Sequence, residues 1–74
     1  MPKLYSAREI TSVLSKAGFI VVSQKGSHIK LRGERKGKIV TPIVPNHKSV
    51  ARGTFLSILK QAAMTLGEFE SYKK

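Results

Sequence analysis

The chain has 74 residues, with 14 Lys and Arg, 4 Asp and Glu and no cysteine, which gives a formal net charge of +10 at pH 7. A chain of this length forms one small domain, here 1–74, and without cysteine it has neither disulfides nor thiolate metal ligands. No apolar run approaches the roughly 20 residues that span a bilayer, and the N-terminus lacks a signal-peptide pattern, so we expect a soluble, cytoplasmic protein. The excess of positive charge indicates a polyanionic partner, most commonly RNA or DNA. A membrane is disfavoured because the basic residues do not gather on one amphipathic helix.

The first predicted element is a helix that begins after Ser6. Ser6 is a favourable N-cap, and Glu9, three residues later, completes a capping box. Gly18 supplies the stop signal at the other end. Between these signals, apolar residues recur at helical spacing and are expected in the core: Ile10, Val13, Leu14 and Ala17.

Three strands and two turns are predicted next. Residues 19–24 are mostly β-branched or aromatic, Lys25-Gly26 is a turn, and residues 27–33 alternate between apolar and basic side chains. Residues 34–37 form a second, polar turn, and residues 38–44 form a third strand. Because Pro42 cannot donate a hydrogen bond to a neighbouring strand, this third strand is expected to be short or to lie at an edge of the sheet.

The last part of the chain is predicted to be helical. After a loop at residues 45–49, a helix is expected from about Arg52, and Thr65 with Glu68 forms a second capping box that begins a short terminal helix. The apolar side chains of this region are expected in the core together with Phe19: Phe55, Ile58, Leu59, Ala62, Leu66 and Phe69. The predicted fold is α+β, in the order α-β-β-β-α, with a three-stranded antiparallel sheet. Its helices cover one face and leave the other, basic face exposed.

The exposed face carries the residues with the most chemical interest. On the second strand, His28 shares the polar side with Lys30 and Arg32, and Lys25 precedes the turn. Histidine suits proton transfer near neutral pH, and cations stabilise the charge that develops on a reacting phosphate. This set favours metal-independent RNA cleavage, in which a base removes the proton of a ribose 2′-OH. The alternative for His28 is an ordinary surface residue on the polar side of a strand.

Other reaction types lack the residues that they require. The chain has no Asp, and its four Glu do not cluster with its histidines, so we predict no metal site and no other cofactor. A Ser-His-Asp triad lacks its acid, cysteine chemistry lacks its thiol, and there is no phosphate-binding glycine loop. Base stacking is disfavoured as the main mode of recognition, because the strands lack paired aromatic residues.

Four residues near His28 or His47 remain open to a simpler interpretation. Gly26 fits a turn glycine with positive φ, although a glycine there also allows RNA backbone to approach closely. Ser27 fits a local hydrogen bond or an inward-facing side chain. His47 offers a second proton carrier, but in its predicted loop, which also contains Lys48, a surface position or a phosphate contact is favoured.

Several segments of the chain occur in a familiar combination. They are Arg8-Glu9-Ile10 with Leu14, Gly18-Phe19, Gln24-Lys25-Gly26-Ser27-His28, Pro45-Asn46-His47, and Gly53-Thr54-Phe55-Leu56-Ser57-Ile58-Leu59-Lys60-Gln61-Ala62. This combination resembles the HicA toxin family, the small mRNA-cleaving partners of HicA–HicB toxin–antitoxin pairs. The resemblance implies a double-stranded-RNA-binding-domain-like fold and a ribosome-independent mRNA interferase. It also implies that the catalytic histidine is His28, that Gly26 and Ser27 shape the turn that presents it, and that a HicB-type antitoxin covers the site.

The leading hypothesis is a type II toxin that cleaves mRNA without a metal, with His28 as the general base. The residues expected to bind RNA phosphates are Lys25, Lys30, Arg32, His47 and Lys48. The rival hypothesis is a non-catalytic double-stranded-RNA-binding module, which fits the fold and charge equally well. A DNA-binding regulator ranks third, because the basic residues lie largely on strands and no recognition helix stands out.

Overall fold

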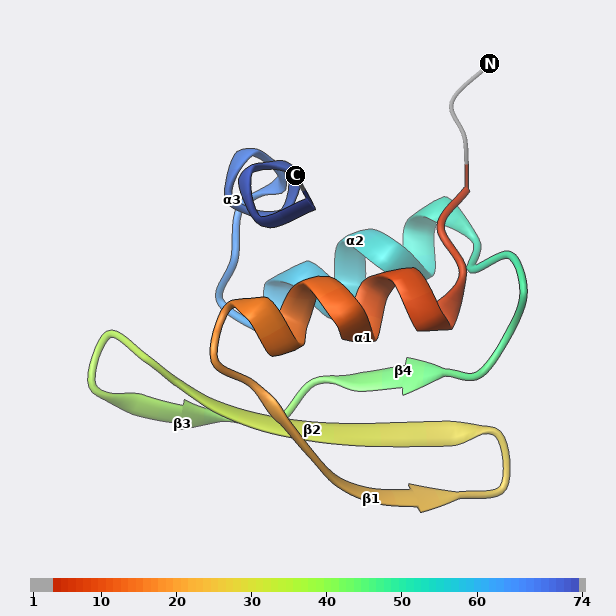
Figure 1. Ribbon diagram of the computed structural model, residues 1–74, viewed down its shortest axis with the longest axis horizontal. Helices are drawn as coiled ribbons and strands as arrows, with labels where there is room; N and C mark the ends of the chain where they lie inside the picture. The colour runs from red at the N-terminus through yellow and green to blue at the C-terminus, as the bar shows by residue number, and fades with distance from the viewer. Residues whose placement is uncertain (1–3, 74) are drawn as a thin grey trace.

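The computed structural model describes residues 4–73 and confirms the predicted α+β class. The helices pack on one face of an antiparallel sheet and leave its other face uncovered (Figure 1). In chain order the elements are α1 (Ala7–Lys16), β1 (Ile20–Lys25), β2 (His28–Arg35), β3 (Lys38–Val40), β4 (Ile43–Pro45), α2 (Arg52–Gln61) and α3 (Leu66–Lys73). No helix among the described residues is long and apolar enough to cross a membrane.

Helix α1 begins and ends where its local signals predict. The Glu9 backbone N–H donates to the Ser6 hydroxyl at 3.1 Å, and the Ser6 N–H donates to the Glu9 carboxylate at 2.9 Å, so the capping box is confirmed. At the other end, Ala17 is the C-cap and Gly18 follows it with φ +101°, a conformation that glycine adopts without steric cost. These signals act through neighbouring residues, so the sequence alone was enough to predict them.

The β1–β2 hairpin is confirmed with small shifts in its boundaries. Lys25 pairs with His28, so only Gly26 and Ser27 lie in the turn, and Gly26 has φ +57°. A glycine with positive φ at the first of two turn positions is typical of a type II′ turn, whose twist matches that of the strands. The register shifts by one residue between Val21 and Ser23, which places a bulge at Val22 in β1.

The predicted third strand is present but interrupted. Strands β3 and β4 both pair with β2 and keep one register, yet residues 41–42 between them belong to neither strand. The Leu31 N–H still donates to the Pro42 carbonyl at 3.0 Å, whereas Pro42 has no N–H to return the bond. The proline therefore divides one edge strand into two short ones, as its chemistry led us to expect.

The predicted second turn was too long. Glu34 and Arg35 belong to β2, and the turn contains only Lys36 and Gly37, with φ values of +53° and +79°. Two successive residues with positive φ are typical of a type I′ hairpin turn. The polarity of residues 34–37 suggested a loop, but pairing with β3 holds the first two of them in the sheet.

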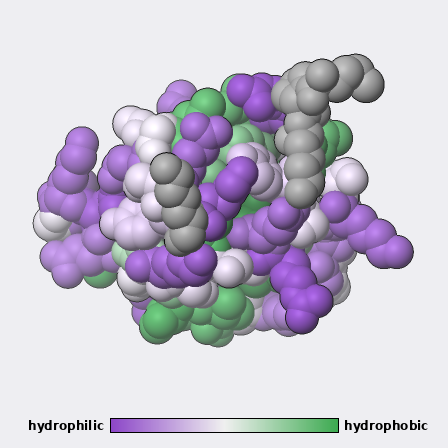
Figure 2. All heavy atoms as spheres, turned by 45° about the horizontal axis from the view of Figure 1, so that its top comes forward, coloured by the Kyte–Doolittle hydropathy of each residue, from purple (hydrophilic) through white to green (hydrophobic). Residues whose placement is uncertain are grey.

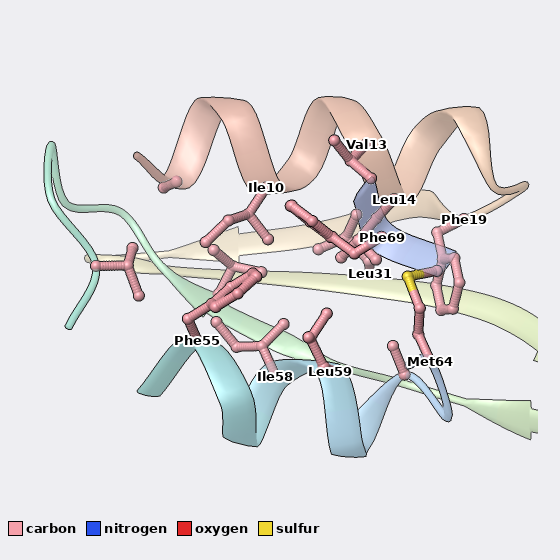
Figure 3. Close-up of a cluster of buried hydrophobic side chains, with 14 of the residues drawn as sticks. Ile10, Val13, Leu14, Phe19, Leu31, Phe55, Ile58, Leu59, Met64 and Phe69 are labelled. Atoms are coloured by element: carbon pink, nitrogen blue, oxygen red, sulfur yellow. The ribbon is translucent and has the colours of Figure 1, made fainter. Parts of the chain in front are cut away.

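The core lies between the helices and the inner face of the sheet (Figure 3). The three phenylalanines expected there are confirmed: Phe19 and Phe55 are 2% exposed and Phe69 is fully buried. Phe55 and Phe69 pack edge to face, with ring centroids 4.9 Å apart. Side chains from α1 and α2 point toward one another in this space, among them Ile10, Val13 and Leu14 from α1 and Phe55, Ile58 and Leu59 from α2.

Helix α3 is fixed by its cap and by an ion pair to the sheet. The predicted second capping box is confirmed, because the Thr65 and Glu68 backbone N–H groups donate to each other's side chains, both at 3.1 Å. The other carboxylate oxygen of Glu68 accepts from the guanidinium of Arg35. The hydrogen bonds from Arg35 and then from Thr65 hold the pKa of Glu68 below its usual value.

Candidate nucleic-acid interface

The candidate site lies on the sheet face that no helix covers. Along β2 the side chains alternate strictly, so Ile29 and Leu31 are buried while His28, Lys30 and Arg32 are exposed. We call this uncovered side the outer face. Because alternate residues of a strand are about 6.6 Å apart, the three polar side chains form a row of roughly 13 Å.

Strand register adds a fourth cation beside His28. Lys25 on β1 is the direct cross-strand neighbour of His28, and Pro45 on β4 is its neighbour on the other side. Directly opposite residues have Cβ atoms about 5 Å apart and share a face of the sheet. The fold therefore brings together the four residues that the sequence singled out on this face: Lys25, His28, Lys30 and Arg32.

The surroundings of His28 are electropositive and open. Within residues 4–73, no side chain or backbone group makes a hydrogen bond with its imidazole, and the residue is exposed. Glu34 is on the same face of β2 but six residues along, about 20 Å away. The imidazole can therefore reach a bound molecule without first breaking an internal contact.

The turn before His28 is held in place by the segment that follows β4. The Asn46 N–H donates to the Ser27 carbonyl at 2.6 Å, so Ser27 acts through its backbone rather than through an inward-facing side chain. Gly26 has the predicted positive φ, and a Cβ added there would meet nothing within 4 Å. Space around this turn is therefore open, and the glycine is required by the backbone conformation.

His47 and Lys48 lie in a different environment from the outer-face cations. They line an open hollow of about 420 Å³ together with Ser6, Arg8 and Asn46. The His47 carbonyl accepts the Ala7 N–H at 2.9 Å, which attaches this segment to the start of α1. The structure thus separates the five predicted phosphate-binding residues into two groups at neighbouring places, and Arg8 in the second group was not predicted from the sequence.

Exposed aliphatic side chains also occur on the outer face, which the sequence did not lead us to expect. Ile20 pairs with Arg32, Ile39 with Glu34, and Ile43 with Lys30, and the three isoleucines are 42–64% exposed. Strand register decides which aliphatic residues face outward. In β4, for example, Val44 is buried in the core and the neighbouring Ile43 is exposed. Figure 2 shows hydrophobic atoms gathered along the lower margin of the molecule, where the sheet lies, beneath a largely hydrophilic helical side.

Metal-ligand residue types are sparse in the candidate site, where the two histidines represent them. Among residues 4–73 there is no group of three His, Cys, Asp or Glu side chains that could hold a metal ion. The available chemistry is that of the exposed His28 imidazole with three flanking cations, and of three basic residues at the neighbouring hollow: Arg8, His47 and Lys48.

Comparison with known proteins identifies the family. A family model described as the HicA toxin of bacterial toxin–antitoxin systems matches residues 7–64, which include α1, the whole sheet and α2. The chain belongs to the HicA toxin family. HicA toxins are known as mRNA interferases, and membership implies a cognate antitoxin. A comparison with curated proteins gave no match.

Proposed function

We propose that this HicA toxin is a metal-independent endoribonuclease whose outer face binds single-stranded mRNA and whose His28 removes the proton of a ribose 2′-OH. The observation that carries the proposal is the position of His28. It is exposed on the outer face, with Lys25 opposite it on β1 and Lys30 as the next residue of β2 on the same face. An imidazole beside several cations, with the glutamate of its own strand about 20 Å away, fits a reaction that generates negative charge on a phosphate.

The reaction follows from this arrangement. His28 accepts the 2′-OH proton, the 2′-oxygen bonds to the adjacent phosphorus, and the bond from phosphorus to the 5′-oxygen breaks. The 5′-oxygen takes a proton from solvent, which leaves one product with a 2′,3′-cyclic phosphate and the other with a 5′-OH. Lys25, Lys30 and Arg32 hold the phosphate oxygens while the extra charge develops. Because the nucleophile is part of the substrate, the reaction needs no metal-bound water.

The same face suits neutralisation by an antitoxin. Its cations would pair with acidic side chains, and the exposed isoleucines between them would supply apolar contact area. A HicB-type antitoxin that covers the outer face would block His28 and the phosphate-binding lysines together.

Product analysis tests the proposal. Purified toxin is incubated in EDTA with a long single-stranded RNA, and the ends of the fragments are identified by mass spectrometry. The proposal predicts cleavage with 2′,3′-cyclic phosphate and 5′-OH ends. Fragments with 3′-OH and 5′-phosphate ends would exclude the 2′-OH reaction. Binding without loss of RNA integrity would instead favour the non-catalytic RNA-binding module.

A further inference from the structure

A second basic cluster lies at the end of the molecule where His28 is presented. The β1–β2 turn, the segment after β4 and the start of α1 all lie at this end (Figure 1). Two backbone hydrogen bonds join them, from Asn46 to Ser27 at 2.6 Å and from Ala7 to His47 at 2.9 Å. Asn46 and His47, which line the hollow, are therefore attached both to the turn that precedes His28 and to the start of α1.

The side chains around this hollow favour an anion. Arg8, His47 and Lys48 line it together with the polar Ser6 and Asn46, and no carboxylate is among its lining residues. Positive side chains that lie close together repel one another, and a bound anion reduces that cost. The hollow is open to solvent and all its lining residues carry polar or charged groups, which fits a flexible charged strand.

The position of Arg8 is not explained by helix stability. Arg8 is in the first turn of α1, where the helix macrodipole favours acidic residues and disfavours cations. Arg8 also lines a second hollow of about 510 Å³ along α1, which Lys16, Lys73 and the carboxylate-bearing Glu9 share. Arg8 therefore lies at the border of the two hollows, one without a lining carboxylate and one that contains Glu9.

We propose that Arg8 binds a phosphate of the RNA strand that flanks the cleaved bond, so that the substrate passes from the outer face over residues 46–48 and along the start of α1. Arg8 is thus a positioning residue for a longer substrate, and not a catalytic residue. This inference rests on the proposed function, because it extends the RNA path from His28.

The test compares Arg8→Gln with Lys60→Gln, which removes the same charge from an exposed position on α2 that lines neither hollow. Once cleavage is mapped in a long RNA, two substrates are made, one that extends well beyond the cleaved bond on both sides and one trimmed to the nucleotides next to it. For the long RNA, Arg8→Gln is expected to raise KM about tenfold with kcat unchanged. It should also reduce the slope of log affinity against log salt by about 0.7, the value for one phosphate contact on a single strand. For the trimmed RNA the two variants should behave alike, and Arg8→Lys should restore most of the affinity for the long RNA.

The outcomes separate the two proposals. If the wild-type toxin cleaves RNA but Arg8→Gln matches Lys60→Gln on both substrates, the inference about Arg8 is wrong and the proposed function stands. If the wild-type toxin does not cleave RNA at all, both are wrong. An equal rise in KM on the long and the trimmed RNA would also overturn the inference, because it would show a general loss of charge or structure instead of a contact with flanking RNA.

Discussion

Gly33 on β2 allows the sharpest stability prediction from this fold. A Cβ built on Gly33 would lie 2.7 Å from Cδ2, 2.8 Å from Cγ and 2.9 Å from Cε2 of the Phe19 ring. Carbon atoms in favourable contact are about 3.5–4.0 Å apart, so the ring would have to move by roughly 1 Å. Rotation of the ring about the Cβ–Cγ bond leaves Cγ in place, so the whole ring must move, and Phe19 is only 2% exposed, so that movement displaces core neighbours.

We expect Gly33→Ala to destabilise the protein by about 2 kcal/mol, within the usual range for overpacking a core. For a domain of this size each kcal/mol corresponds to about 4–8 °C, so the melting temperature should fall by about 8–16 °C. Backbone conformation adds nothing to this cost, because Gly33 is not among the glycines with positive φ. Thermal and urea unfolding followed by circular dichroism would measure the effect.

Gly53→Ala is the matched control. Gly53 is in α2, and a Cβ there would meet nothing within 4 Å, so alanine should raise stability by about 0.5 kcal/mol through its better helix propensity. Phe19→Leu combined with Gly33→Ala gives a second check, because removing the ring should make the two changes less than additive. A Gly33→Ala protein that melts at or above the wild-type temperature would show that the core around Phe19 accommodates the added methyl group without cost.

Two further predictions concern charge. Because the pKa of Glu68 is lowered in the folded protein, the stability it contributes is present above the ordinary glutamate pKa and is lost as pH falls through the lowered value. Urea unfolding between neutral and acidic pH should therefore show a weaker acid dependence for Glu68→Gln than for Glu70→Gln, and equal profiles would contradict the role of the Arg35 ion pair. On the outer face, Lys30→Gln should lower the salt slope of RNA binding by about 0.7. Lys38 pairs with Arg35, which is on the opposite face from Lys30, so Lys38→Gln should leave the slope unchanged. The same slope in both variants would count against the predicted RNA surface.

Local signals made much of the fold predictable. Both capping boxes join residues three positions apart, and the alternation along β2 assigned Ile29 to the core and His28 to the outer face without any knowledge of its neighbours. Pro42 likewise predicted that the third strand would be short or at an edge, because a proline has no N–H to donate to a neighbouring strand in any sheet.

The structural features that the sequence did not predict depend on strand register and on contacts between segments far apart in the chain. Pairing with β3 decides that Arg35 belongs to β2, and pairing with β2 decides that Ile43 is exposed. The hollow at Arg8 exists because the segment containing His47 is attached to α1, a contact between residues forty positions apart. No local pattern encodes that contact, although the basic residue in the first turn of a helix was a visible anomaly.

RNA cleavage in EDTA by wild-type toxin, His28→Ala and His47→Ala tests whether His28 is the general base. Both histidines are exposed, so neither change should unfold the protein, and circular dichroism would verify this. We expect His28→Ala to bind RNA but no longer to cleave it, and His47→Ala to cleave. Normal cleavage by folded His28→Ala would show that His28 is not the general base.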